Sequence, residues 1–322
     1  MPREKIKCIT SIGGQALIEG IMMRGPKKTV MAVRQPDGTI TLETLAAKDP
    51  RTRHPILKLP ILRGVAAFVD SLSVGYHALS RSAEISGLEE AEEGEESKFE
   101  RWLNDKFGDK IMNVIMGIGT IFGILLAIAL FFVLPTWLFN VAQTISGGNF
   151  SIWRSPLEGL LRILIFLVYI VLISRMSDVR RLFQYHGAEH KTIFCYESGE
   201  ELTVENVRRH RRFHPRCGTS FLVLMLLVGI IIGMFIPFSN PFVRTAVKLL
   251  CVPLVMGIGY EMIRYCGKNE NMLTRVIAAP GLWFQHITTQ EPDESMIETA
   301  IAAMKEVIPE NGEDKIVLNG RS

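Results

Sequence analysis

The longest uncharged stretch of the chain, residues 111–153, constrains the fold more than any other feature of the sequence. Its first part, residues 111–134, reads IMNVIMGIGTIFGILLAIALFFVL. An apolar helix of this length crosses a hydrocarbon layer about 30 Å thick. Pro135 and Trp137 follow directly, which predicts that the span ends there at the membrane interface. With 48% hydrophobic and 21% charged residues, the chain is too apolar for an ordinary soluble enzyme and too charged for a bare bundle of spans.

Three further segments have the composition of membrane spans. A second uncharged run covers 218–243, and two weaker candidates, 157–174 and 245–262, carry a few charges near their ends. In the first of these weaker spans, Glu158 and Arg162 stand four residues apart, which predicts an ion pair on one helix face. The alternative for the weaker pair is a buried or interfacial helix, because short apolar runs are ambiguous. We predict a polytopic α-helical membrane protein with about four transmembrane helices.

The distribution of basic residues predicts the topology. Lys and Arg are frequent in 1–110, in the connection 175–217 and in 261–322, and they are scarce in the connections 135–156 and 239–248. By the positive-inside rule, the basic segments face the cytoplasm. We therefore expect a multi-pass protein of the cell (inner) membrane with both termini cytoplasmic. The net charge of +3 gives no general reason to expect nucleic acid as a partner.

The segments outside the spans contain a small β unit and amphipathic helices. Residues 29–44 alternate around a Gln-Pro-Asp-Gly turn, which predicts a β-hairpin, and the glycines of 13–28 indicate close approach of the backbone to another group. Residues 56–81 are apolar but interrupted by charges, which predicts an amphipathic helix that lies on the membrane or against the spans, and 294–308 carry one helical apolar stripe. Residues 282–287 (LWFQHI) resemble an interfacial anchor. The predicted segments are a Gly-rich and β-hairpin unit (1–55), amphipathic helices and an acidic linker (56–110), a first transmembrane pair (111–174), a cytoplasmic His-rich segment (175–217), a second transmembrane pair (218–262) and a C-terminal interfacial and amphipathic region (263–322).

Two pairs of histidines in the cytoplasmic His-rich segment are the strongest candidates for chemistry. His186, Glu189 and His190 have the spacing H-x-x-E-H, and His210 and His214 are again four residues apart. On a helix, residues i and i+4 lie one turn apart on the same face, so both imidazoles reach one metal ion. A Glu beside the second His is placed to accept a proton, as in the inverted zincin pattern.

Several interpretations of these residues remain open. Zinc or another divalent metal suits imidazole ligands, with Cys217 as an optional thiolate. A catalytic site takes three of the four histidines as ligands and Glu189 as the base, whereas a structural site fills every position with protein ligands. Without metal, the histidines make hydrogen bonds in an Arg-rich segment that meets anionic headgroups. Cys217 as a nucleophile partnered by His214 is a further, less supported possibility.

Four motifs spread along the chain, GGQALIEGIMMRGP, RHPILKLPILRG, YHGAEHKTIFCYE and HPRCGTSF, resemble the bacterial YqhQ family, a membrane family built on a domain of unknown function. The family is described as a predicted metal-dependent enzyme of the membrane. Its His-rich motif falls on His186, Glu189, His190, His210 and His214. The resemblance therefore implies a metal but names no substrate.

Two functions follow as hypotheses from these observations. The first is an integral membrane metal-dependent hydrolase at the cytoplasmic interface, acting on an anionic headgroup, a lipid-linked molecule or a membrane-tethered peptide. The second is a non-enzymatic membrane adaptor or assembly factor, with a structural metal or an anionic-lipid-binding His/Arg segment and a cytosolic or membrane protein partner. Transport ranks last, because the spans carry almost no charge that would mark an ion path.

Overall fold

The computed structural model describes residues 8–45, 55–87, 109–147, 153–269 and 271–316. These residues are mostly helical, and they form two compact units. Unit 1 comprises residues 1–87, 170–225 and 253–322, and unit 2 comprises residues 88–169 and 226–252. Within the predicted segment 56–110, residues 88–108, which include the acidic linker, lie outside the described residues.

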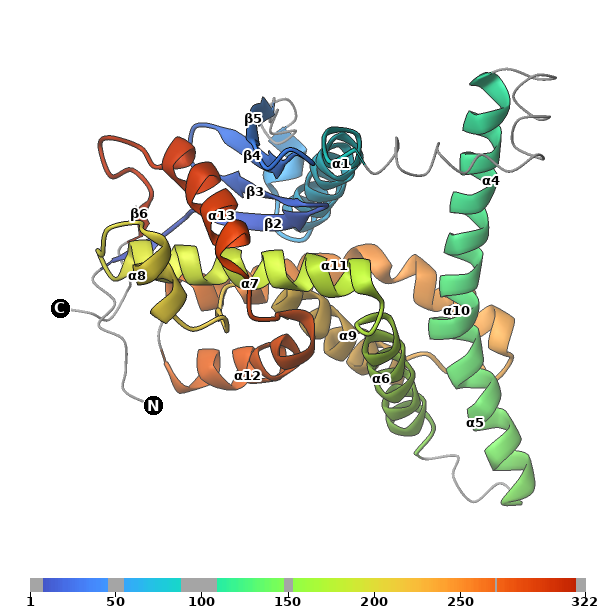
Figure 1. Ribbon diagram of the computed structural model, residues 1–322. Coiled ribbons are helices and arrows are strands. Elements are labelled where there is room, and N and C mark those ends of the chain that lie inside the picture. Colours follow the sequence, from blue (N-terminus) through green and yellow to red (C-terminus); the bar gives the residue numbers. More distant parts are fainter. Residues whose placement is uncertain (1–7, 46–54, 88–108, 148–152, 270, 317–322) are drawn as a thin grey trace. The chain divides into compact units, whose positions relative to one another are not determined.

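Unit 1 is built around an antiparallel sheet of four strands in the order β2-β3-β4-β5 (Figure 1). The strands are β2 (Gly13–Leu17), β3 (Gly20–Arg24), β4 (Thr29–Arg34) and β5 (Ile40–Leu45). The hairpin predicted over 29–44 is confirmed as β4 and β5, with Arg34 opposite Ile40. The glycine-rich segment before it forms a second hairpin, so the β unit is twice as large as the sequence pattern predicted.

Helices cover both faces of this sheet. Ile21 and Met23 on β3 point into a core shared with α7 (Ser177–Glu197) and α13 (Glu294–Val307), whereas Met22 points to the opposite face, where α1 (Leu62–Ile85) packs. This alternation follows the two-residue period of a strand. The apolar stripe predicted over 294–308 is confirmed, because α13 buries it against β3, β4 and α7.

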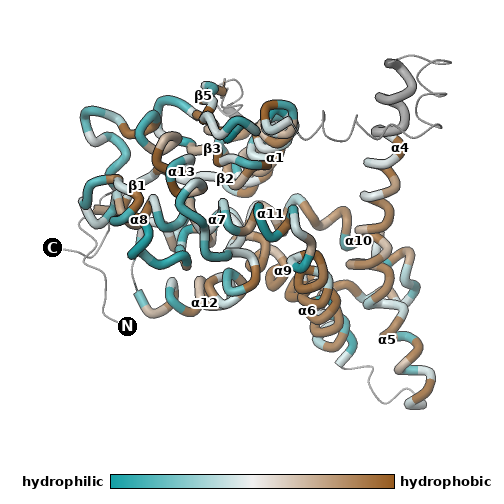
Figure 2. The backbone as a smooth tube through the Cα atoms, viewed as in Figure 1, coloured by the Kyte–Doolittle hydropathy of each residue, from teal (hydrophilic) through white to brown (hydrophobic). Residues whose placement is uncertain are grey.

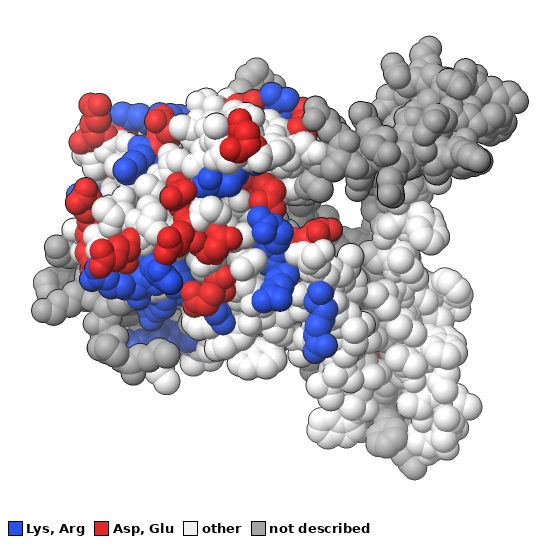
Figure 3. All heavy atoms as spheres, viewed as in Figure 1, with Lys and Arg blue, Asp and Glu red and all other residues white. Residues whose placement is uncertain are grey.

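The remaining elements of unit 1 surround α7. They are β1 (Ile9–Thr10), η2 (Pro55–Lys58), α8 (Val204–Arg209), α11 (Val252–Lys268), α12 (Met272–Thr288) and β6 (Lys315–Ile316). The amphipathic stretch over 56–81 does form a helix, α1, but it buries small residues such as Gly75 and Ala78 against the sheet. Figure 3 shows charged side chains gathered on the visible face of unit 1.

The helices of unit 2 are largely apolar and are drawn mostly brown in Figure 2. They are α4 (Asp109–Ile128), a π-helical turn η3 (Ala129–Val133), α5 (Leu134–Ile145), most of α6 (Arg154–Ile173), the second half of α9 (Gly218–Met234) and α10 (Pro241–Leu250). Among the described residues, two helical stretches, Gly117–Ile145 and Arg154–Ile173, are long and apolar enough to cross a membrane. α10 and α11 together would make a third, and α9, with 17 residues, lies at the lower limit of a spanning length.

Two details of unit 2 differ from the sequence expectations. The first span does not end at Pro135, because the helix continues to Ile145. The π-turn just before Pro135 accommodates a residue that has no N–H to donate. The expected ion pair between Glu158 and Arg162 is also wrong: Glu158 binds Arg154, Arg244 and Lys248 instead.

Candidate metal centre

Helix α7 carries the H-x-x-E-H motif through the interior of unit 1. His186, Glu189 and His190 are all buried on this helix. Gly187 does not interrupt it, because the glycine allows the Gln290 carbonyl to lie where a Cβ would stand. The helix that the spacing required is therefore present, and its two imidazole rings lie 4.4 Å apart between centroids.

A cysteine from another element joins these two histidines. Cys217 directly precedes α9, and its Sγ lies 3.1 Å from Nε2 of His186. One ligand atom from each of His186, His190 and Cys217 lies within 4.8 Å of the others. All three residues are buried, so the group has the donor atoms and the spacing of a transition-metal site.

Backbone carbonyls fix the proton on each imidazole. Nδ1 of His186 lies 2.8 Å from the carbonyl oxygen of Thr288, and Nδ1 of His190 forms a hydrogen bond with the carbonyl oxygen of Arg212. Because a carbonyl only accepts, each Nδ1 carries the hydrogen and each Nε2 keeps a lone pair. Nε2 of His190 is buried and has no hydrogen-bond partner among the described residues. Metal-binding histidines are oriented in this way, with the second nitrogen donating to a carbonyl.

The environment also favours the protonation states that a metal requires. Burial lowers the pKa of His190 to about 4, which keeps the ring neutral near pH 7. Burial by itself raises the pKa of the Cys217 thiol, but His190 and the hydrogen bonds of Thr219 outweigh it and lower that pKa overall. A neutral imidazole and a thiolate are the forms that bind zinc.

Glu189 lies beside the three candidate ligands and is held by the glycine-rich hairpin. Its Oε1 accepts a hydrogen bond from the Gly14 N–H at 3.0 Å. A Cβ on Gly14 would stand 2.9 Å from the Glu189 carboxyl carbon, so the strand passes this close only because the residue is glycine. Burial raises the pKa of Glu189 to about 7, against the opposing effect of His186. A carboxyl group with this pKa accepts and returns a proton near neutral pH.

His214 lies next to the group but is engaged by other partners. Its ring centroid is 5.5 Å from that of His190. The Arg216 N–H lies 3.4 Å from its Nδ1, and Glu197 lies 3.7 Å from its Nε2. Burial raises the pKa of Glu197, but the hydrogen bond with His214 and the charge of Arg216 lower it overall. His214 therefore packs beside the His190 ring but is not one of the three residues at ligand spacing.

His210 lies in a different cluster. It follows α8 as its C-terminal cap, and it shares ligand spacing with Cys195 and Glu200. The second histidine pair is not helical, because α8 ends at Arg209, and its two rings therefore point to different places. Burial and Glu200 raise the pKa of Cys195 to about 11, which disfavours the thiolate that a metal needs. The structure does not bring all four predicted histidines into one ligand set.

A cavity of about 620 Å³ opens beside the three candidate ligands. Glu189, His190 and Cys217 line it, together with the cationic side chains of Arg216 and Arg264. Apolar residues from α9, α11 and α12 complete the lining: Leu224, Ile263, Ile277 and Ala278. A ligand of this cavity would contact both polar residues of the candidate metal centre and apolar side chains.

Sequence reasoning missed several of these contacts. Gly14, Thr288 and Arg212 contribute backbone atoms, and no side-chain pattern reveals such contacts. Cys217 was expected only as an optional ligand, and the spacing gave no reason to pair it with His186. The glycines of 13–28 did signal a close approach, and the group approached is Glu189.

Two imidazoles, a thiol and a buried carboxyl thus lie together beside a cavity, a donor set that suits a transition metal. The family model described as "Protein of unknown function (DUF1385)" matches residues 59–310. The chain is 32% identical over 305 residues to "Uncharacterized protein YqhQ" of Bacillus subtilis, covering 94% of each chain. The chain therefore belongs to the DUF1385, or YqhQ-like, family. No solved structure matches it.

Proposed function

We propose that this protein is a metal-dependent hydrolase that works at the cytoplasmic surface of a membrane. The observation that carries this proposal is the buried group of His186, His190 and Cys217, whose imidazoles each present an Nε2 lone pair toward a thiol within 4.8 Å. Three protein ligands leave a fourth coordination position open, as in catalytic zinc sites. A divalent ion bound there would supply Lewis acidity for the polarisation of a substrate oxygen.

The protein's own residues account for the rest of the chemistry. Glu189 accepts a proton from water and returns it to the leaving group, because its raised pKa of about 7 suits both directions. The Gly14 N–H holds the carboxyl group in place. Arg216 and Arg264 line the cavity and attract an anionic group on the substrate.

The substrate class follows from the walls of the cavity. The lining combines cationic and apolar side chains, which fits an amphiphile with an anionic, phosphate-bearing head rather than a small polar metabolite. Two helices long and apolar enough to span a membrane support a location where such lipids or lipid-linked molecules are available. We place the site and both termini on the cytoplasmic side, from the distribution of basic residues.

Metal analysis of the purified protein tests the proposal. We expect one equivalent of zinc or another divalent metal in the wild type, and its loss in His190→Ala and in Cys217→Ser. His210→Ala is the matched control and should retain the metal, because His210 lies in the other cluster. A wild-type protein that binds no divalent metal after loading would overturn the proposal.

A second variant separates catalysis from a structural role. Glu189→Gln should retain the metal and lose hydrolysis of bis-p-nitrophenyl phosphate, used as a general phosphodiester probe. If the wild type hydrolyses this probe and Glu189→Gln does so equally fast, Glu189 is not the base. A metal-loaded wild type inactive on phosphodiester, phosphomonoester and carboxylic ester probes would favour the adaptor function, in which the metal only holds the His-rich segment in shape.

A further inference from the structure

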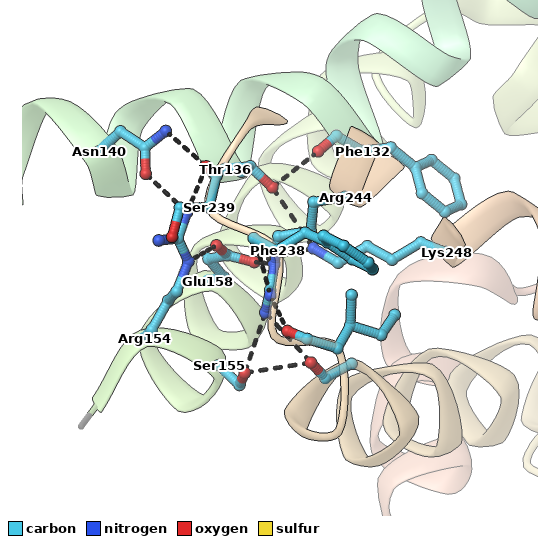
Figure 4. A network of polar contacts seen from close by, with 12 residues as sticks. Phe132, Thr136, Asn140, Arg154, Ser155, Glu158, Phe238, Ser239, Arg244 and Lys248 are labelled. Carbon is cyan, nitrogen blue, oxygen red and sulfur yellow. Dashed lines mark hydrogen bonds and ion pairs between the residues drawn. The ribbon is translucent and has the colours of Figure 1, made fainter. Parts of the chain in front are cut away.

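Unit 2 contains a buried polar cluster that the proposed chemistry does not use. Figure 4 shows it between α5, α6, the end of α9 and α10. Glu158 and Arg244 are only 2% and 1% exposed. Charged side chains inside a membrane unit are expensive and mark functional sites.

The charges in this cluster do not balance. Among the side chains that the structure describes in unit 2, the only carboxylate is Glu158, and the cations are Arg154, Arg162, Arg244 and Lys248. Oε1 of Glu158 accepts from Arg154 at 3.0 Å. Its Oε2 accepts from Arg244 at 2.9 Å and from Lys248 at 2.8 Å. Three cations therefore share this carboxylate, and among the described contacts it accepts no hydrogen bond from the fourth, Arg162.

Neutral oxygens satisfy the remaining donors of Arg244. Its guanidinium binds the carbonyls of Gly233, Ile236 and Phe238 and the hydroxyl of Ser155. The Gly233 carbonyl lies in the last turn of α9, where the helix dipole is negative, and the other two carbonyls follow the helix. Arg244 thus holds the end of α9 to α6, but the neutral oxygens supply hydrogen bonds rather than a counter-charge.

Among the described residues of unit 2, Arg162 is the cation without a hydrogen-bond acceptor. It is 8% exposed, and its Nε has no hydrogen-bond partner among the described residues. Its guanidinium lies over the Phe132 ring, 4.9 Å from the centroid, and within electrostatic reach of Glu158 and Arg244. A planar guanidinium with free donors matches the two oxygens of a phosphate.

We infer that Arg162 is the centre of a binding site for the phosphate of an anionic lipid. An apolar unit is reached from the bilayer, and a lipid phosphate brings one negative charge to a cluster with an excess of cations. Trp153 is exposed just before α6, which places the start of this helix at the headgroup level. Arg162 lies eight residues after Arg154, about 12 Å along the helix, and a long side chain reaches back toward the helix start. Phe132, the ring that lies against the guanidinium, is itself only half-buried.

This inference rests on the membrane location in the proposed function and not on the metal centre. A metal analysis that fails would leave it intact, and a failed lipid test would leave the metal centre intact. The two proposals can therefore be tested separately on the same preparation.

Thermal unfolding of the full chain in an uncharged maltoside detergent tests the inference. We expect added phosphatidylglycerol to raise the melting temperature of the wild type and of Arg175→Gln, which removes the same charge from an exposed position after α6. Arg162→Met should fold, because it removes an unpaired buried cation, and it should bind phosphatidylglycerol at least about tenfold more weakly. Arg162→Lys keeps the charge without the planar fork and should show an intermediate shift.

Two results would overturn this inference. One is an undiminished phosphatidylglycerol shift in Arg162→Met, or in Arg162→Lys if the methionine variant does not fold. The other is an equal shift of the wild type with inorganic phosphate alone, which would show that the site takes the free ion rather than a lipid. Native mass spectrometry provides a second readout, since the wild type should retain a phosphatidylglycerol molecule that Arg162→Met loses.

Discussion

The buried polar regions described in unit 1 and unit 2 contain opposite kinds of unpaired atoms. In unit 1, His186 and His190 donate from Nδ1 to carbonyls and keep lone pairs on Nε2. In unit 2, Arg162 keeps donors and a positive charge with no acceptor among the described residues. The converging lone pairs in unit 1 favour binding of a cation, and the unpaired donors in unit 2 favour binding of an anion. The type of unpaired atom, rather than burial itself, therefore indicates what each region would bind.

The regions also differ in how they reach neutrality. In unit 1 the titratable groups change their protonation state: burial keeps His190 deprotonated and neutral, and it raises the pKa of Glu189 to about 7, which favours the protonated, neutral carboxyl group. Unit 2 has arginines, which do not lose their protons in proteins, so its excess charge has to be matched from elsewhere. The following predictions test this difference, from the largest expected effect to the smallest.

Removal of the carboxylate of unit 2 should have the largest effect. Glu158→Gln leaves Arg154, Arg244 and Lys248 without their shared partner, and a broken buried ion pair costs about 3–5 kcal/mol. We expect a clear fall in melting temperature in maltoside. Glu298→Gln, which removes an exposed partner of Arg34, is the control. Equal melting temperatures for the two variants would show that the cluster does not depend on its carboxylate.

Acid should destabilise unit 1 through its neutral histidines. The pKa of His190 falls from its ordinary 6.5 to about 4 in the folded protein, so the unfolded chain takes up the proton first as the pH falls. The stability contribution is complete above pH 6.5 and is lost progressively down to about pH 4, by about 3 kcal/mol. The lowered pKa of His214 acts in the same direction. Urea unfolding of chelator-treated protein across this range checks the slope, which should be shallower in His190→Asn; an identical slope would contradict the assignment.

A methyl group on α7 should weaken the metal site indirectly. Gly187→Ala places a Cβ against the Gln290 carbonyl and displaces the segment whose Thr288 carbonyl orients His186. Loss of such an orienting contact typically lowers metal affinity about 10- to 100-fold. Zinc titration against a chelator measures the change. Gly119→Ala is the matched control, because a Cβ there meets nothing within 4 Å; similar affinities for both variants would rule out the mechanism.

Exposed ion pairs should matter least. Arg208 and Glu294 lie 2.7 Å apart, but both side chains are about two-thirds exposed. A double-mutant cycle with Arg208→Ala and Glu294→Ala should give a coupling free energy below about 1 kcal/mol. If this coupling free energy equals the loss of stability caused by Glu158→Gln, exposed and buried charges do not differ in their contribution to stability.

Local patterns in the sequence predicted the local structure well. Alternation predicted the hairpin of 29–44, the apolar stripe predicted α13, and the four-residue spacing placed His186 and His190 on one face of α7. Each of these depends on residues a few positions apart, where periodicity carries the information. The ligand set itself stays a prediction until metal is measured.

The rest depended on contacts between distant residues. Cys217 reaches His186 from 31 positions away, and Lys248 reaches Glu158 from 90 positions away. The i,i+4 rule favoured Arg162 as the partner of Glu158, but Arg154, at the same spacing on the other side, forms the bond together with α10. Arg154 and Arg162 are each four residues from Glu158, so spacing alone does not tell which of them pairs with it. The tertiary packing decides.

The π-turn η3 has a consequence for how this protein tolerates length changes. A π-turn holds one residue more than the α-helix that would replace it. Deletion of one residue from Ala129–Val133 would therefore restore a regular helix and leave the residues after it facing as they do now. Thr136 and Asn140, which bind Lys248 and Arg154, would keep these contacts. A deletion within the regular turns of α5 before Asn140 would instead rotate the residues after it by about 100°, so the surplus residue of η3 is a place where this helix can shorten without rebuilding the contacts around Glu158.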